Sequence, residues 1–258
     1  MYPYICYMNI SYGQVSFSLV GLVMLERKIM KELESVSDKD RALNLQRFFK
    51  TGKGEYGYGD VFAGITIPQI RAICKRYYKE LSLDEITFFI QHQIHEYRMF
   101  GLLTLTYIWK KADDKKKDDI YSLYVKNLQY INNWDLVDLS APNIVGQYLK
   151  GKDRSFLYEL VKSNDLWKQR VAIISTAAFI RDVDFKDTLE ISKFLLHHSH
   201  DLIHKAVGWM LREVGKRDLA VEENFLKKYY KEMPRTMLRY AIERFEEEKR
   251  QRYLKGLV

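Results

Sequence analysis

The chain has 258 residues, of which 47% are hydrophobic, and its formal net charge is +8 at pH 7. This length allows one large domain or two small ones, and this hydrophobic content excludes a largely disordered chain. The positive charge is compatible with an anionic partner such as nucleic acid. The two cysteines, Cys6 and Cys74, lie far apart in the sequence, which indicates a reducing cytoplasmic compartment and not a disulfide framework.

The first 23 residues carry no charged side chain and precede "MLERKIMKELES", a segment typical of a first helix. A signal peptide would start with positive charge, but no Lys or Arg precedes Arg27. Tyr, Ser, Asn and Gly interrupt the segment, so we do not predict a membrane span. We interpret residues 1–23 as an upstream extension and expect the working protein, a single domain over residues 24–258, to begin near Met24.

From Met24 to Phe245, apolar residues recur at three- and four-residue spacing, which is typical of amphipathic helices. The expected breaks are short, such as "KTGKGEYGYGD" (50–60), "KADDKKKDD" (111–119) and "KEMPRT" (231–236). The first of these is rich in glycine but lacks the lysine–serine ending of a phosphate-binding loop, so we interpret it as a turn that could touch DNA. No long linker divides the chain, which predicts one all-helical domain.

Five predicted helices resemble one another when they are aligned: residues 96–111, 132–149, 167–181, 202–217 and 235–245. Their starts are roughly 32 to 37 residues apart, within the range of two-helix repeats of the HEAT or armadillo kind. Second helices, such as "DTLEISKFLLHHSH", lie between them. We therefore predict an all-α fold, an α-solenoid of HEAT-like repeats in which corresponding helices form one concave face.

The helix that begins in "NNWDLVDLSAP" (132–142) carries an unusual pair of side chains. Asn132 or Asn133 can cap its N-terminus, and Asp135 suits the positive end of the helix dipole. Trp134 and Asp138 are four residues apart and therefore share one helix face.

The following repeat helices carry aromatic and basic residues at similar spacing. They are Trp167 and Arg170, then the stripe Lys205, Trp209, Arg212 and Lys216, and finally Arg235 and Arg239. A concave surface of indoles, cations and one acid would suit a polyanion that carries a cationic or aromatic group.

Each of these features also has an ordinary structural explanation. A tryptophan at helical spacing is more often a core residue, an acid one turn later is usually a surface group or a partner for arginine, and a basic stripe is usually a solvated face. In "HHSHDLIH" (197–204), His200 and His204 have the spacing of metal ligands. Neither a HExxH pattern nor partner cysteines accompany them, so we predict no metal site.

Four segments together carry a resemblance to a known family: "FAGITIPQIR" (62–71), "NNWDLVDLSAP" (132–142), "SNDLWKQRVAI" (163–173) and "HDLIHKAVGWMLREVGKRD" (200–218). Through them the chain resembles, from about Met24 onward, the DNA alkylation repair family of AlkD-like, HEAT-repeat DNA glycosylases. The resemblance implies monofunctional excision of positively charged N3- and N7-alkylated purines from double-stranded DNA. It also implies that this hydrolysis needs no metal or organic cofactor and no deep pocket for a flipped base.

The resemblance assigns roles to individual residues. Asp138 matches the catalytic carboxylate, and Arg170 matches the arginine beside it. Trp134 and Trp209 match the two indoles that flank the backbone of the lesion. Phe48 stands where the family has a tyrosine, so this ring lacks the hydroxyl, which Tyr56 or Tyr58 could supply.

The chemistry of the reaction agrees with these residue types. An ionised Asp138 can stabilise the cationic sugar that forms as the base leaves, and indole faces attract cations. We expect Lys205, Arg212, Lys216, Arg235 and Arg239, together with Phe48, to contact DNA. The working protein would be a cytoplasmic, nucleoid-associated monomer. The alternative is a non-catalytic HEAT-repeat module that binds DNA or protein through the same face.

Overall fold

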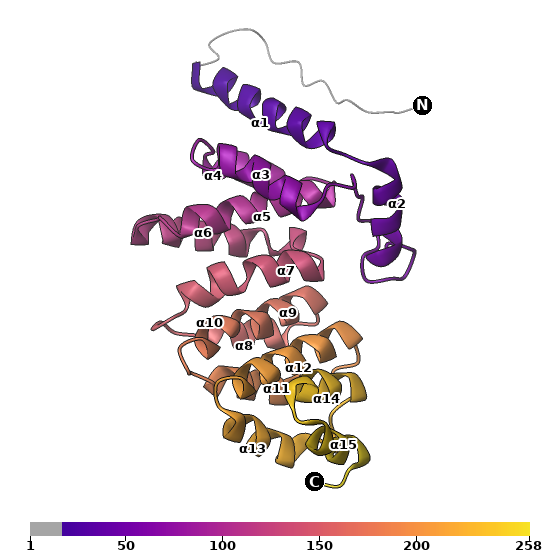
Figure 1. Ribbon diagram of the computed structural model, residues 1–258. Coiled ribbons are helices and arrows are strands. Elements are labelled where there is room, and N and C mark those ends of the chain that lie inside the picture. The colour runs from indigo at the N-terminus through magenta and orange to yellow at the C-terminus, as the bar shows by residue number, and fades with distance from the viewer. Residues whose placement is uncertain (1–16) are drawn as a thin grey trace.

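The computed structural model describes residues 17–258, with side chains from Met24 onward, and these residues are almost entirely helical (Figure 1). The α-helices are α1 (Phe17–Ser35), α2 (Lys39–Phe48), α3 (Ile67–Tyr77), α4 (Leu83–Ile90), α5 (His95–Trp109), α6 (Asp114–Lys126), α7 (Trp134–Ser140), α8 (Ser155–Lys162), α9 (Leu166–Ser175), α10 (Ala177–Ile180), α11 (Lys186–Phe194), α12 (Asp201–Gly215), α13 (Leu219–Tyr229), α14 (Arg235–Ala241) and α15 (Glu247–Lys255). Between Phe17 and Val258 the only β contact is one isolated bridge, Val61 to Ile94. The all-α prediction is therefore confirmed.

Most of the predicted extension, residues 1–16, lies outside the described part of the chain. Helix α1 begins at Phe17, so the last residues of that extension continue into the first helix. None of the helices that the structure describes is long and apolar enough to cross a membrane.

Several helices begin with a polar N-cap residue at the end of the preceding loop. Thr66 and Gln69 form a reciprocal capping box at α3, and Ser82 and Glu85 form another at α4. Each box satisfies backbone N–H groups that have no partner inside the helix. These local signals explain where the helices begin, independently of the packing between them.

The helices stack in chain order from the N-terminus to the C-terminus (Figure 1). Helices α3, α5, α7, α9, α12 and α14 contact one another in succession, and α4, α8 and α13 pack beside α5, α9 and α12. The five helices that align as repeats in the sequence are α5, α7, α9, α12 and α14, which are all members of this series. This arrangement is compatible with the predicted solenoid.

Some predicted helices are shorter than their periodicity suggests. Helix α7 ends at Ser140 and continues as a π-helical turn over Pro142–Gly146, with the Gly146 N–H donating to the Ala141 carbonyl at 2.9 Å. Pro142 has no N–H, so it cannot donate to the Asp138 carbonyl as a regular helix would require. A second predicted helix, residues 167–181, is also interrupted: it divides at Thr176 into α9 and α10.

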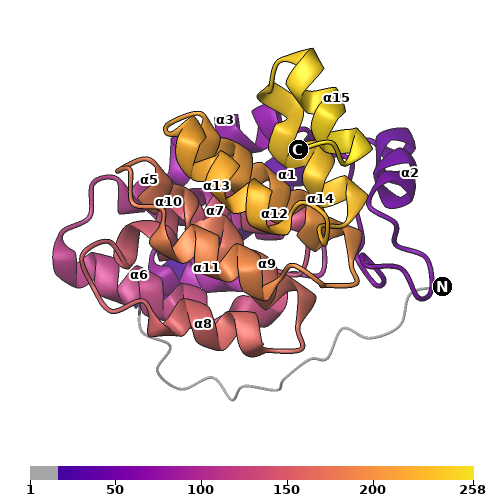
Figure 2. The same cartoon turned by 90° about the horizontal axis from the view of Figure 1, so that it is seen from below.

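Helix α2 stands beside the stack and contributes no buried residue (Figure 1). Viewed along the stack, α2 and α14 lie on the same side, and α6 lies on the opposite side (Figure 2). The segment that follows α2 is anchored by the buried Glu96 carboxylate, which accepts hydrogen bonds from the N–H groups of residues 63, 64 and 65. Gly64 has φ +78°, and a Cβ there would collide with the Asp38 carbonyl oxygen. This close approach explains the glycine in "FAGI".

Candidate functional site

A cleft of about 720 Å³ lies between the end of α2 with the segment after it and the helices α7, α9, α12 and α14. It is lined by Phe48, Lys50, Gly54, Glu55, Tyr56, Trp134, Asp138, Arg170, Ser199, His200, Asp201, Leu202, Lys205, Trp209 and Tyr240. The lining thus includes six predicted site residues, drawn from the four helices α2, α7, α9 and α12: Phe48, Trp134, Asp138, Arg170, Lys205 and Trp209.

Trp134 forms one wall of this cleft. Of the two candidate caps, Asn133 is the one used, because its Oδ1 accepts from the Trp134 N–H at 2.9 Å. The indole stacks on the buried ring of Phe49 with centroids 5.2 Å apart, and Phe48 meets it edge-on at 6.1 Å. The ring is half-buried, so it is backed by the core while it lines the cleft.

Asp138 and Arg170 form a bidentate ion pair at the base of the cleft. Arg170 donates from Nε to Oδ1 at 2.9 Å and from Nη2 to Oδ2 at 2.8 Å, and its Nη1 donates to the Leu202 carbonyl at 2.5 Å. The Asp138 side chain is 18% exposed and that of Arg170 is 5% exposed. Burial raises the pKa of Asp138 above its usual range, and the guanidinium opposes this shift. The carboxylate is therefore fixed in place but reachable from the cleft.

Trp209 and Lys205 contribute a second wall from α12. Trp209 is half-buried, and its Nε1 donates to Glu213 at 3.3 Å. Lys205 pairs with Asp201 at 2.8 Å on the preceding turn of the same helix. Trp109, by contrast, is a core residue with 8% exposure. The indoles of Trp134 and Trp209 do not have the burial of core tryptophans.

Four of the predicted DNA contacts lie outside the cleft lining. Arg212 pairs with Glu243, and Lys216 pairs with Glu213 at 2.6 Å. Arg235 donates to the Leu254 carbonyl at 2.8 Å, and Arg239 is exposed. Binding of DNA by these residues stays a prediction.

Tyr56, in the glycine-rich segment, reaches across the cleft. Its ring meets Trp167 edge-on at 6.1 Å and His200 at 6.3 Å, and its hydroxyl donates to the Phe48 carbonyl at 3.4 Å. Burial raises the pKa of Tyr56 above its usual range. Tyr58 is 65% exposed and does not line the cleft. Of the two tyrosines considered as substitutes for a hydroxyl near Phe48, only Tyr56 lies in the cleft.

Several lining residues were not predicted as site residues. Tyr240 directly follows Arg239 in the last repeat helix. It lines the cleft because the face of this helix that points to the cleft is one residue away from the face predicted from Arg235 and Arg239. The sequence suggests His200 only through its metal-ligand spacing to His204, but in the structure its Nδ1 accepts from the Leu202 N–H at 3.1 Å and caps α12. Over residues 17–258, no three His, Cys, Asp or Glu side chains are placed to hold a metal ion.

The chain is similar to known proteins in its sequence and in its fold. A family model described as a DNA alkylation repair enzyme matches residues 29–245. A solved structure described as a predicted DNA alkylation repair enzyme from Enterococcus faecalis aligns with a TM-score of 0.63 and 17% identity, over 82% of this chain and 97% of that chain. This likeness shows a shared fold. No curated protein matches the sequence.

Proposed function

The chain belongs to the DNA alkylation repair enzyme family, and from this premise we propose that it is a monofunctional DNA glycosylase. Its substrates would be positively charged N3- and N7-alkylated purines in double-stranded DNA. The observation that carries this proposal is the Asp138 carboxylate, held by Arg170 at the base of a cleft walled by Trp134 and Trp209.

The reaction needs mainly a negative charge close to the deoxyribose. An alkylated purine already carries positive charge, so it leaves as a neutral base when the electron pair of its bond to C1′ returns to the ring. Positive charge then develops on the deoxyribose, where an ionised Asp138 would stabilise it. A water molecule adds to C1′ and gives its proton to the carboxylate or to solvent, which leaves an abasic site.

The aromatic residues would bind the cation before the bond breaks. The Trp134 and Trp209 indoles can attract a cationic group, with about 0.5–2 kcal/mol from each ring. Tyr56, whose ring packs edge-on against Trp167 and His200, would form a further aromatic wall of the cleft. The combination favours a cationic lesion over an unmodified base.

The second candidate function is a non-catalytic module that binds DNA or protein through this face. One observation favours it: both oxygens of Asp138 already accept from Arg170, as in an ion pair that serves only to hold two helices together. In that case the neutral Asn variant of Asp138 would lose stability and would have no excision to lose.

The test is a single-turnover assay on duplex DNA that contains one 7-methylguanine, with released base and abasic sites both quantified. We expect the wild-type chain to excise the base and Asp138→Asn to be slower by orders of magnitude, each tenfold being about 1.4 kcal/mol of transition-state stabilisation. Binding to lesion DNA should hold or increase, because one negative charge near phosphate is removed.

A matched control is Asp182→Asn, which removes an exposed carboxylate paired with Lys150 and not found in the cleft lining. It should excise at the wild-type rate. Absence of excision by the wild-type chain on both 7-methylguanine and 3-methyladenine, with intact DNA binding, would favour the non-catalytic module. Near-normal excision by Asp138→Asn would remove Asp138 from the catalytic role.

A further inference from the structure

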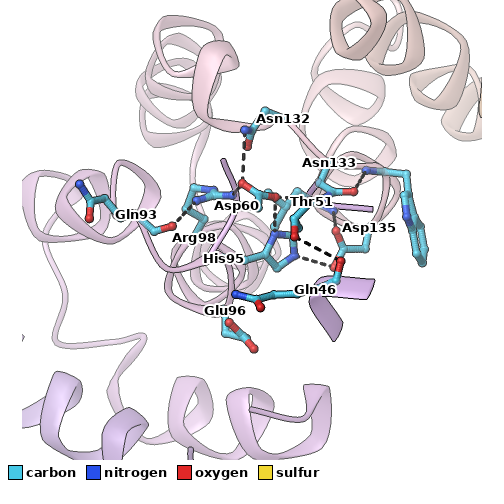
Figure 3. A network of polar contacts seen from close by, with 12 residues as sticks. Gln46, Thr51, Asp60, Gln93, His95, Glu96, Arg98, Asn132, Asn133 and Asp135 are labelled. Atoms are coloured by element: carbon cyan, nitrogen blue, oxygen red, sulfur yellow. Dashed lines mark hydrogen bonds and ion pairs between the residues drawn. The ribbon is translucent and has the colours of Figure 1, made fainter. Parts of the chain in front are cut away.

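A buried histidine joins three segments of the chain, one of which carries the cleft residue Trp134 (Figure 3). His95, the first residue of α5, is 2% exposed. Its Nδ1 lies 3.2 Å from Asp60 Oδ2, and its Nε2 lies 2.8 Å from Asp135 Oδ2. The imidazole therefore stands between two carboxylates that are distant from each other in the sequence.

The geometry requires the charged form of this ring. Ionised carboxylates only accept hydrogen bonds, so both ring nitrogens of His95 must carry a proton to satisfy both partners. Arg98 Nη2 donates to the other oxygen of Asp60 at 2.5 Å, which gives two cations and two anions in balance. Burial lowers the pKa of His95, but Asp135 and Asp60 outweigh burial and raise it to about 9.

The network holds the first turn of α7 on both sides of Trp134. Asp60 also accepts from the Asn133 amide at 3.0 Å and lies 3.5 Å from the Asn132 amide (Figure 3). Asp135, held by His95, follows Trp134 and lies one turn before Asp138. The two residues that flank the indole are thus both tied to the Asp60–His95 pair.

We propose that His95 in its charged form is a positioning residue, which fixes Trp134 and Asp138 by tying Asp135 to Asp60. This inference rests on the proposed glycosylase function for its activity measurement. A neutral His95 has a single N–H, so one carboxylate would face a ring lone pair, and the first turn of α7 would lose its anchor. Excision should then fall although no residue in contact with DNA has changed.

The groups that face His95 are few. They are Asp60 from the segment before α3, Asp135 from α7 and Arg98 from the next turn of α5. Phe62 stacks on the imidazole at 4.5 Å and Phe49 lies at 5.3 Å, and both are uncharged. Arg98 favours the neutral ring, so the two carboxylates alone account for the charged form.

The first test is His95→Gln in the full chain, with single-turnover excision of 7-methylguanine measured from pH 6 to pH 10. Misplacing a catalytic group by about 1 Å can cost about 100-fold in rate, and we expect a loss of that order below pH 9. The wild-type rate should fall as pH rises through about 9, and the variant should lack this fall. His92→Gln is the control, because His92 lies on the same segment and its Nδ1 accepts only from the Ile94 N–H.

The second test is Asp135→Asn, which separates positioning from simple loss of stability. With an amide at residue 135, a neutral imidazole can donate to Asp60 from Nδ1 and accept from the amide at Nε2. His95 can then make both hydrogen bonds in its charged form and in its neutral form, so the fall in excision rate at alkaline pH should disappear. A purely structural role would lower the melting temperature of both variants and leave the pH profile unchanged in shape.

NMR titration of the histidine signals tests the charge state of His95 without measuring excision, so it separates this inference from the proposed function. The imidazole signals of His95, identified by their absence in His95→Gln, should titrate near pH 9 in the wild-type chain and at lower pH in Asp135→Asn, and the Trp134 indole signal should shift with them. If the wild-type chain excises nothing at any pH, the proposed function fails and these signals still decide the inference. Titration of His95 near pH 6.5, or wild-type rate and pH profile in His95→Gln, would overturn it.

Discussion

At the scale of residues, the two cleft indoles combine packing with exposure. Trp134 rests on Phe49, and Trp209 packs against the core, yet both line the cleft. Removing such a ring should affect DNA binding and excision more than the stability of the fold. Removing a fully buried aromatic residue should instead affect stability more than binding and excision.

We therefore expect Trp209→Ala to slow excision at least tenfold with little loss of unfolding free energy. Trp109→Ala is the matched comparison, because truncation of a core tryptophan costs about 3–5 kcal/mol. Urea unfolding and single-turnover excision on the same preparations measure both effects. A loss of stability for Trp209→Ala equal to that of Trp109→Ala, with normal excision per folded molecule, would place Trp209 in the core.

Glu222 is a buried acid on α13, outside the cleft lining. It is 2% exposed, and its Oε1 has no hydrogen-bond partner. Burial, with help from Glu223, raises its pKa to about 8, and Arg212 opposes the shift. Since the folded state binds this proton more tightly than the unfolded state, ionisation of Glu222 destabilises the fold: the penalty is absent below pH 4.5, grows up to about pH 8 and is constant above it.

Glu222→Gln removes this penalty without changing the size of the side chain. The stability difference between variant and wild type should grow with pH by at most about 1.4 kcal/mol per unit and then level off near pH 8. Chemical unfolding from pH 4 to pH 9 measures it, and the contribution of His95 cancels because both chains contain it. A difference that does not change with pH would contradict the assignment.

At the scale of elements, the position of α2 decides the shape of the cleft. Helix α2 buries no residue of its own, and the segment after it is held through Glu96 and the close approach at Gly64. Phe48, Lys50 and Tyr56 line the cleft from the arm formed by α2 and residues 49–60, which this attachment helps to hold in place together with the buried ring of Phe49. A small change at the attachment should thus be felt at the site.

Gly64→Ala should displace this arm, because the new Cβ would meet the Asp38 carbonyl oxygen and the φ of +78° disfavours alanine. We expect a lower melting temperature and reduced excision. Gly59→Ala is the control: its φ is +89°, but no atom lies within 4 Å of the added Cβ, so it carries the backbone strain without the collision, and Gly59 does not line the cleft. Equal effects of the two substitutions would mean that strain alone, and not the position of α2, matters.

At the scale of the whole molecule, the charge of +8 is not concentrated in the cleft. The cleft lining carries three cations, Lys50, Arg170 and Lys205, and three acids, Glu55, Asp138 and Asp201, so its formal charges cancel. Arg170 is paired with Asp138, and Lys205 with Asp201. The basic residues beyond the lining would then provide most of the long-range attraction for DNA. Arg239, which is exposed, and Arg212 and Lys216, which have exposed or partly exposed partners, are the candidates.

We expect the double variant Arg212→Gln, Lys216→Gln to bind all duplex sequences more weakly. The slope of log affinity against log salt should become less steep by about 0.9 for each phosphate that the variant no longer neutralises. Lys193→Gln, Lys228→Gln on α11 and α13 makes the same change in net charge away from the cleft and should bind as the wild type. The same weakening in both double variants would mean that only net charge matters.

The sequence by itself determined the helical class, the repeat helices and six of the residues that gather around the cleft. Helix periodicity and capping are local, because they depend on residues three or four apart. The pair Asn132 and Asn133, with Asp135, therefore already marks the start of α7, and the structure selects Asn133 as the cap. The resemblance to the family added Asp138, Arg170 and the two indoles, which the structure brings together from three helices.

Only the tertiary structure decided which faces and loops meet. Tyr240 rather than Arg239 lines the cleft, and Tyr56 rather than Tyr58 closes it, because the packing angle of α14 and the path of residues 50–60 are set by distant contacts. The link from Asp60 through His95 to Asp135 joins residues 35 and 40 positions apart. Such pairs leave no periodic signal, since their distance is fixed by how helices pack and not by the local chain.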